Sequence, residues 1–278
     1  MDTIHRLGGY REYRPPPDLR DVVQVVWVYA RSPGGDPGSP DPRHRVLPDP
    51  GVSVAFQCLR DRDGGVSNPR VVLHGPVMTP RLFRPRPGLH LEGVRLKPEW
   101  CPDLLDLEPR DHADADRDLR EVAPGKARAL PHRLEDTRHS REAIGILLDE
   151  VRRLLAGARP SRATLLAHAG LEGIRGPHLR SLNLSGLAGE LGVSPRHLRR
   201  VIRERTGMGP KRLQRILRLG GAVVEADRLP RPSWARLAVA SGFYDQAHLI
   251  QEFRDLTDRT PTRLHAERRT QSAPAAAS

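Results

Sequence analysis

The chain has 278 residues and a formal net charge of +12, with 37% hydrophobic and 29% charged residues. This length suggests two domains of ordinary size, and the composition is that of a globular protein. No apolar run approaches the roughly 18 residues that span a bilayer, and the first residues lack the apolar core of a signal peptide. We therefore expect a cytoplasmic protein with no membrane partner.

The positive charge is concentrated in the C-terminal part of the chain. Of the 46 basic residues, 43 are arginine, but a GC-rich genome also produces many arginines, so their number alone is weak evidence for nucleic-acid binding. Their distribution is more informative. Residues 1–159 hold 26 basic and 24 acidic residues, whereas residues 160–278 hold 20 and 10. A clustered positive surplus of this kind attracts polyanions such as DNA.

Residues 1–138 are predicted to form a β-rich domain. Apolar and alternating patterns predict strands over Val22–Tyr29, Val52–Cys58, Arg70–His74 and Leu89–Leu96. Clusters of Pro, Gly and Asp between these stretches favour turns. Cys58 lies on the same side of its strand as Val54 and Phe56, so we interpret it as a buried structural thiol.

One amphipathic helix is predicted over residues 139–159, after the β-rich domain. Ser140 can cap it, and apolar residues spaced by three and four form one stripe that ends before Gly157 and Pro160. The helix could cover the first domain, connect it to the second, or pair with another copy. Covering is the preferred interpretation. At the other end of the chain, residues 269–278 are predicted to be a disordered tail.

Two short helices joined by a tight turn are predicted in the basic C-terminal part. Ser185 can cap the first helix, and Gly192 suits the left-handed residue that closes it. Val193 follows as a buried plug. Ser194 then caps the second helix, with Pro195 at its first position. This arrangement is a helix-turn-helix.

The second of these helices carries arginines opposite its apolar face. They are Arg196, Arg199, Arg200 and Arg203. A guanidinium can donate two parallel hydrogen bonds to guanine or to a phosphate. Because the N-terminal turn of such a helix enters the major groove, we expect the first three arginines to contact bases and Arg203 to contact phosphate. A merely solvated arginine face is the alternative, and the matching cap, turn and plug residues make it less favoured.

The same pattern recurs about fifty residues later. Ser233 can cap a helix that Gly242 closes, Phe243 is the plug, and Asp245 caps a second helix. The side chains expected to face DNA from that helix are Gln246, His248 and Gln251. Gln246 can pair with adenine. For His248, a phosphate contact and a bond to a neighbouring backbone group are both left open.

A single helix over Lys211–Asp227, stopped by Pro230 and Pro232, is predicted to connect the two units. Such a connector would fix the separation of the two recognition helices. Successive major grooves on one face of DNA lie about 34 Å apart, so a monomer with this spacing could read two grooves at once.

Residues 160–268 resemble the AraC/XylS-type family of bacterial transcriptional regulators. The residues that carry the resemblance are Leu187-Ala188 and Leu191–Arg200 in the first unit, and Leu237-Ala238, Ser241–Leu249, Phe253-Arg254 and Thr260-Pro261 in the second. The second set is the more discriminating, because Gly-Phe-x-Asp-Gln-x-His with a trailing Thr-Pro rarely arises by chance.

The resemblance implies an all-helical domain of about seven helices, so that the whole chain is an α+β protein. It also implies sequence-specific binding to double-stranded promoter DNA and control of transcription, often activation, with RNA polymerase as a partner. Two residues depart from the family pattern. Gln251 stands where many members carry Arg or Lys, which would alter a phosphate contact or base preference. Asp258 stands where Gly is usual before the Thr-Pro pair, which would strain a turn.

The N-terminal part resembles an uncharacterised domain found ahead of this DNA-binding module. The resemblance rests on Tyr13–Pro16, Trp27, Val46–Asp49, His74–Pro76 and Gly93–Pro98. Other family members place an effector-binding β-barrel here. By analogy, residues 1–138 are a candidate sensor of a small-molecule effector. The sequence leaves a homodimer open.

No catalytic, metal or cofactor site is predicted. The acidic run Asp111–Asp118 lacks the Gly and Glu spacing of a calcium loop, and we interpret it as a solvated turn. No phosphate loop, dinucleotide fingerprint or nucleophile motif occurs. We therefore expect no enzyme. The alternative to a regulated transcription factor is a constitutive or architectural DNA-binding protein.

Overall fold

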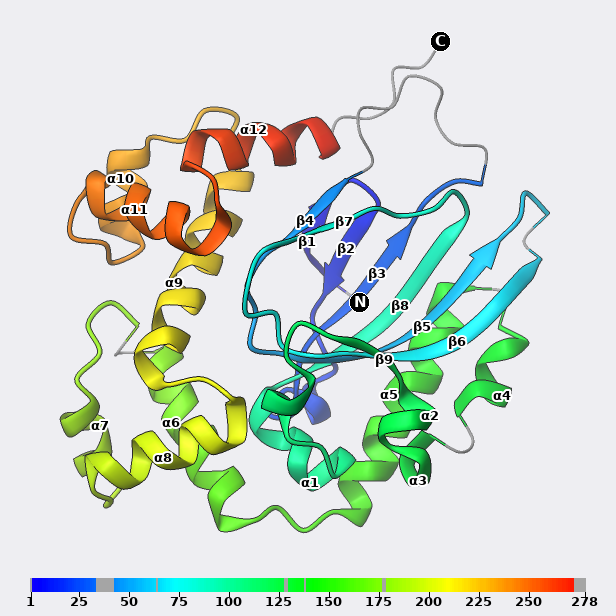
Figure 1. Cartoon of the computed structure of the whole chain (residues 1–278), viewed down its shortest axis with the longest axis horizontal. Helices are drawn as coiled ribbons and strands as arrows, with labels where there is room; N and C mark the ends of the chain where they lie inside the picture. Colours follow the sequence, from blue (N-terminus) through cyan, green and yellow to red (C-terminus); the bar gives the residue numbers. More distant parts are fainter. Residues whose placement is uncertain are drawn as a thin grey trace.

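The computed structural model describes residues 2–33, 43–63, 65–127, 130–137, 139–176 and 179–272. The described strands all lie in the first 118 residues, and the remainder of the described chain is helical (Figure 1). The predicted α+β fold class is therefore confirmed.

The described strands form one antiparallel sheet of seven strands and a separate antiparallel pair. The large sheet has the order β1-β2-β3-β8-β5-β6-β9, and β4 pairs with β7. The bounds are β1 Thr3–Leu7, β2 Tyr10–Tyr13, β3 Val23–Ala30, β4 His44–Val46, β5 Val52–Arg60, β6 Val66–His74, β7 Arg81–Phe83, β8 Leu89–Leu96 and β9 Asp116–Asp118. The four predicted strands are present as β3, β5, β8 and the second half of β6.

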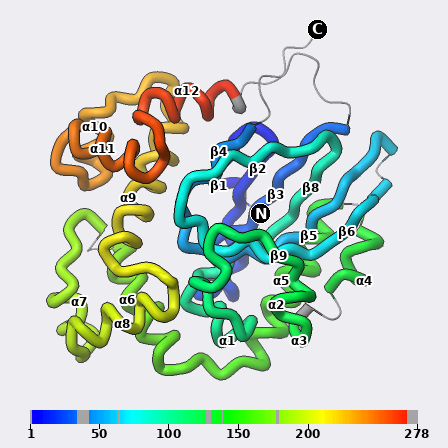
Figure 2. The backbone as a smooth tube through the Cα atoms, in the orientation of Figure 1, coloured from blue at the N-terminus to red at the C-terminus, as the bar shows by residue number. Residues whose placement is uncertain are grey.

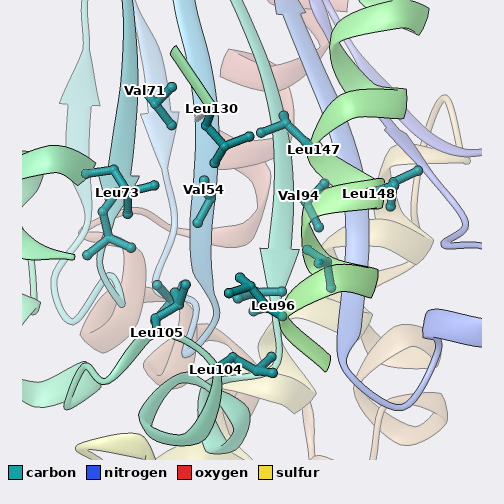
Figure 3. Close-up of a cluster of buried hydrophobic side chains, with 14 of the residues drawn as sticks. Val54, Val71, Leu73, Val94, Leu96, Leu104, Leu105, Leu130, Leu147 and Leu148 are labelled. Atoms are coloured by element: carbon teal, nitrogen blue, oxygen red, sulfur yellow. The ribbon is translucent and has the colours of Figure 1, made fainter. Parts of the chain in front are cut away.

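One face of the sheet is covered by helices. The alternating residues Val54, Val94 and Leu96 point from β5 and β8 to this side, where Figure 3 shows them beside Leu147 and Leu148 of α5 (Ser140–Gly157). Cys58 belongs to the same buried cluster, and burial raises the pKa of its thiol to about 11. The predicted buried thiol is therefore confirmed.

Helix α5 takes the covering role that its amphipathic pattern favoured. Its apolar stripe joins the buried cluster of the sheet. Ser140 does not cap it as expected: the N-cap is His139, and the Ser140 hydroxyl donates a hydrogen bond of 2.7 Å to the buried Glu92 carboxylate of β8. Shorter helices complete this half of the molecule: η1 Pro17–Leu19, η2 Pro98–Trp100, α1 Cys101–Leu105, η3 Pro109–His112, α2 Leu119–Val122, α3 Pro124–Ala127 and α4 Leu130–Glu135.

The opposite face of the sheet carries an aromatic cluster that includes Trp27, Tyr29 and, from β7, Phe83. The indole of Trp27 lies across β8 at Gly93, where any side-chain carbon would come within 2.3 Å of the ring. The indole N–H donates to the Ser53 hydroxyl on β5 at 3.2 Å. A glycine at position 93 is thus required for the tryptophan to lie flat on the sheet.

The helical half begins after α5, where the chain crosses to the other side of the molecule (Figure 2). Its helices are α6 Arg162–Arg175, α7 Leu184–Glu190, α8 Pro195–Thr206, α9 Pro210–Asp227, α10 Trp234–Ala240, α11 Gln246–Thr257 and α12 Pro261–Ser272. None of the described helices is long and apolar enough to span a bilayer. The predicted disordered tail overlaps α12 at residues 269–272, which are helical, and its residues 273–278 lie outside the described part of the chain.

Polar contacts join the two halves at several places. Near α12, Arg45 donates to the Glu267 carboxylate at 3.2 Å, and His5 of β1 lies 3.1 Å from the Arg268 guanidinium. At α6, Lys97 pairs with Glu172 at 3.0 Å. The sheet half, which runs from β1 to α5, is therefore docked against the helical half both near α12 and near α6.

Candidate nucleic-acid interface

The first helix-turn-helix consists of α7 and α8. Its turn has the predicted glycine and cap: Gly192 has the left-handed φ of 65°, and the Ser194 hydroxyl accepts a hydrogen bond from the backbone N–H of His197 at 3.2 Å. The plug Val193, expected to be buried, is only partly buried and packs against the core of the helical half. Pro195 occupies the first position of α8. The first helix starts earlier than expected, because Asn183 caps it, with Oδ1 2.9 Å from the N–H of Gly186. Ser185, the expected cap, lies inside α7.

Helix α8 buries its apolar face and exposes its arginines. Leu198 and Ile202 belong to the core of the helical half. On the opposite face, Arg196, Arg199 and Arg203 are exposed, and they have no hydrogen-bond or ion-pair partner among the described residues. Three neighbouring guanidinium groups without partners form a positive surface that can bind phosphate or base edges.

Arg200 differs from the other three arginines. Its guanidinium contacts both carboxylate oxygens of Glu204 at 3.0 Å and lies 3.1 Å from Nδ1 of His197. These are exposed contacts within one helix, so each contributes little to stability. Arg200 is therefore held along the helix in this structure and would have to leave Glu204 to reach a base.

The second helix-turn-helix consists of α10 and α11 and repeats the first turn. Gly242 has a φ of 76°, Phe243 is buried, and the Asp245 carboxylate accepts a hydrogen bond of 2.7 Å from the N–H of His248. Ser233 precedes α10 as expected but makes no capping hydrogen bond through its side chain. Figure 1 shows the two units at the two ends of α9, both on the side of the molecule away from the sheet.

The three predicted side chains of α11 have different surroundings. Gln246 is exposed and has no partner within the described ranges. Gln251 is exposed, but its amide donates to Asp255 at 2.7 Å. His248 is engaged internally: Nδ1 accepts from the backbone N–H of Tyr244 at 3.3 Å, and Nε2 lies 3.4 Å from the Glu252 carboxylate. Of the two alternatives for His248, the structure favours the backbone contact.

Family comparison matches a helix-turn-helix domain to residues 187–267, the segment that contains both units. The C-terminal part of this chain is an AraC-type DNA-binding domain. Ahead of the AraC-type domain, residues 11–117 match a domain of unknown function (DUF6597). Both resemblances seen in the sequence are confirmed, and the chain is a DNA-binding transcription regulator. No curated protein matches the chain by sequence.

Several solved structures are similar to the chain. An apo variant of ToxT from Vibrio cholerae has 14% identity and a TM-score of 0.46, with 88% of this chain and 97% of that chain covered. The C-terminal domain of AraT, a response regulator from Geobacillus stearothermophilus, has 22% identity and a TM-score of 0.36, with 39% and 89% covered. A DNA-binding transcriptional dual regulator from Escherichia coli K-12 has 23% identity and a TM-score of 0.34, with 39% and 94% covered.

In both units of the AraC-type domain, the recognition helix ends with the same threonine hydrogen-bond pattern. The hydroxyls of Thr206 and Thr257 each donate to the carbonyl four residues earlier, at 2.8 and 2.6 Å, and each accepts from the N–H two residues later. The next residue is left-handed in both, Gly207 with φ 72° and Asp258 with φ 57°. Asp is one of the few non-glycine residues that tolerate this region, so position 258 is compatible with the turn.

A buried arginine that no sequence pattern singles out supports the second unit. Arg218 of α9 donates to the Gly242 carbonyl at 3.0 Å and lies 3.5 Å from Glu252 of α11. Burial lowers the pKa of this guanidinium, and Glu252 opposes the shift. Because Arg215 also contacts Glu252, at 2.8 Å, two arginines of α9 hold the recognition helix of the second unit in place.

Arg254 is a further candidate that was not expected from the sequence. It is exposed, has no partner in the described part of the chain, and follows its N-cap Asp245 by nine residues, as Arg203 follows Ser194. Superposing the two units on their N-caps would have shown this correspondence. Arg254 thus adds a cation to α11 at the position that Arg203 occupies on α8.

Proposed function

We propose that the chain is a sequence-specific transcription factor that places α8 and α11 in successive major grooves on one face of promoter DNA. The 18 residues of α9 span about 27 Å at 1.5 Å per residue. With the width of the attached units, this length is compatible with the roughly 34 Å between successive grooves. The net charge of +10 over residues 160–278 supplies the attraction to the duplex.

The observation that carries this proposal is the set of exposed arginines on α8 that have no partner among the described residues. In our account, Arg196 and Arg199 donate to base edges, most readily guanine, while Arg203 and the newly identified Arg254 contact phosphates. Arg200 also contacts a base, after it breaks its ion pair with Glu204. An exposed guanidinium that pairs with no carboxylate can bind an acidic ligand without first breaking an ion pair.

On α11, Gln246 is proposed to read adenine, and its exposed amide is free to make the two bonds required. Gln251 contacts DNA only if it leaves Asp255. We assign His248 a positioning role, since its ring is used within the unit. Because α8 presents arginines and α11 presents Gln246 to the bases, the two helices would then read sites of different base composition.

Regulation is proposed to act through the contacts between the two halves. A cleft of about 610 Å³ lies between them, and its lining includes Arg14 and Gln24 from the sheet half and Arg175 and Arg228 from the helical half. A small-molecule effector bound there would touch both halves at once. We further propose that the protein acts in the cytoplasm, without catalysis, by presenting the bound promoter to RNA polymerase, as a monomer or a homodimer.

Binding to a duplex selected from a random pool tests the proposal. Full-length protein should prefer this duplex over unrelated DNA by at least about a thousandfold, which is the range of specific regulators. Arg199→Ala should lower that preference by about 5- to 150-fold, the equivalent of about 1–3 kcal/mol. Arg236→Ala, which removes an exposed arginine of α10 outside the recognition helices, should leave it unchanged. Equal affinity for all duplexes would contradict sequence-specific control and favour an architectural DNA-binding protein.

A further inference from the structure

The turns of the two helix-turn-helix units share one backbone hydrogen bond. In each unit the N–H of the plug residue donates to the carbonyl five residues earlier. Val193 donates to Ala188 at 2.9 Å, and Phe243 donates to Ala238 at 2.8 Å. The two plugs therefore occupy equivalent places, and the units can be compared residue by residue from this point.

Beyond the plug, the second unit contains one additional residue. In the first unit the N-cap Ser194 follows the plug directly. In the second unit Tyr244 stands between the plug and the N-cap Asp245. The inserted residue directly precedes the N-cap of the helix that carries Gln246.

The side chain of Tyr244 is 90% exposed, more than any other large hydrophobic side chain in the described ranges. Its hydroxyl makes no hydrogen bond to a described residue. Its backbone is fixed nevertheless, because its N–H donates to Nδ1 of His248 at 3.3 Å and the imidazole packs edge-on against Phe243, with centroids 5.6 Å apart. A rigid turn thus holds an aromatic ring out in water.

We propose that Tyr244 binds the DNA backbone at the rim of the groove that α11 enters. Its hydroxyl would donate to a phosphate oxygen, and its ring would pack on the adjacent deoxyribose. Tyrosine is among the side chains that bind phosphates and so fix the register of a protein on DNA. The inference rests on the proposed function, since the residue precedes the N-terminal turn of the helix assigned to the groove.

DNA is favoured over a protein partner by what surrounds Tyr244. Gln246 and Ala247, the first residues of α11, are exposed beside it, and Arg254 lies two turns along the same helix. Because the DNA-contacting end of a recognition helix is its N-terminal turn, a residue one step before that turn lies beside the sugar-phosphate strand.

The proposed contact has a distinctive salt signature. A phenol hydroxyl carries no charge, so its bond to phosphate displaces no counterion, whereas each arginine–phosphate contact does. Loss of the tyrosine hydroxyl should therefore weaken binding equally at all salt concentrations. Loss of Arg254 should instead reduce the slope of log affinity against log salt by about 1.

The test uses full-length protein with Tyr244→Phe, Tyr244→Ala and Arg254→Ala, and Leu82→Ala as a control. Leu82 is 47% exposed on β7 of the sheet half. Fluorescence anisotropy is measured on the selected duplex and on an unrelated duplex over a range of salt concentrations. We expect Tyr244→Phe to weaken binding to both duplexes by about 10- to 100-fold, as for a lost hydrogen bond to a charged group. Tyr244→Ala should weaken it further, with an unchanged salt slope in both variants.

Wild-type affinity in Tyr244→Phe would overturn the inference, and a reduced salt slope would do so too. If Tyr244→Ala binds DNA normally but no longer activates a promoter, the ring meets a protein, and the inference is also wrong. These results leave the proposed function standing as long as Arg199→Ala weakens specific binding. If the wild-type protein binds no duplex, both proposals fail together. Unchanged thermal unfolding midpoints show that the variants are folded, as expected at a 90% exposed position.

Discussion

The guanidinium of Arg218 lies over the ring of Phe243, with its carbon 4.4 Å from the ring centroid. Arg218 belongs to the connecting helix α9, and Phe243 is the plug of the second helix-turn-helix. Cation–π attraction of this kind is strongest where both groups are desolvated. The contact therefore joins the spacer between the two units to the turn of one of them.

Arg218→Ala should lower the free energy of unfolding by about 2 kcal/mol, because it removes a buried ion pair, a bond to a carbonyl and the ring contact. The loss of stability stays moderate because Glu252 retains its ion pair with Arg215. Urea denaturation of the full chain measures it. Arg231→Ala, which removes an exposed arginine that has no partner among the described residues, is the matched control and should change stability by less than about 0.5 kcal/mol. Equal effects of the two substitutions would contradict a positioning role for Arg218.

Two glycines of the first unit should respond to alanine in opposite directions. Gly207 is left-handed, and an added Cβ would lie 3.0 Å from Cβ of Arg110 in the sheet half. Gly189 lies inside α7 with open space around it. Gly207→Ala should destabilise the protein by about 1–2 kcal/mol, and Gly189→Ala should stabilise it by about 0.5–1 kcal/mol. Thermal unfolding of both variants checks the sign, and a stabilising Gly207→Ala would mean that the two halves separate at this point without cost.

The contact between Arg45 and Glu267 predicts a loss of stability in acid. Burial tends to raise the pKa of Glu267, but hydrogen bonds from Arg259 and Arg45 lower it below its usual value. A carboxyl with a lowered pKa in the folded state stabilises the protein above its unfolded pKa of about 4.3 and stops doing so as the pH falls through the folded value. Glu267→Gln should therefore cost about 1 kcal/mol at pH 7 and almost nothing near pH 3. Urea unfolding of wild type and Glu267→Gln at a series of pH values measures the difference in their free energies of unfolding. A difference that does not change with pH would be evidence against this role of Glu267.

Arg199→Ala and Arg203→Ala should differ in the kind of affinity they lose. Arg199→Ala should cost about 1–3 kcal/mol on the selected site and relax base choice at one position. Arg203→Ala should weaken binding to every duplex alike and reduce the salt slope by about 1. Titrations on matched and single-base variant duplexes separate the two. Identical behaviour of both variants would mean that α8 touches only the DNA backbone.

The helix-turn-helix units could be predicted from sequence because their signals are local. A cap, a left-handed glycine and a plug lie within a few residues of each other, as at Gly192, Val193 and Ser194, and the structure confirms this turn. Local capping signals were misleading at two positions, Ser140 and Ser185. Ser185 is a good capping residue, but Asn183, two positions earlier, made the competing cap.

Contacts between distant parts of the chain could not be predicted from the sequence. Arg218 and Gly242 are 24 positions apart, and Arg45 and Glu267 are 222 apart, so no periodicity connects them. The short strands β1, β2, β4, β7 and β9 were missed for a similar reason: each has only three to five residues and gains its extended form from pairing with a neighbour. His248 is a similar case within the site. A histidine at this position could contact DNA, but its ring instead accepts a hydrogen bond from the backbone of the turn.

A base-resolution footprint of the selected duplex tests the central claim most directly. If α8 and α11 enter successive major grooves, methylation protection should fall in two patches on one face, with centres about 10 base pairs apart. Arg199→Ala should remove protection from one patch only, and Gln246→Ala from the other only. A single patch, or two patches half a helical turn apart, would contradict the account.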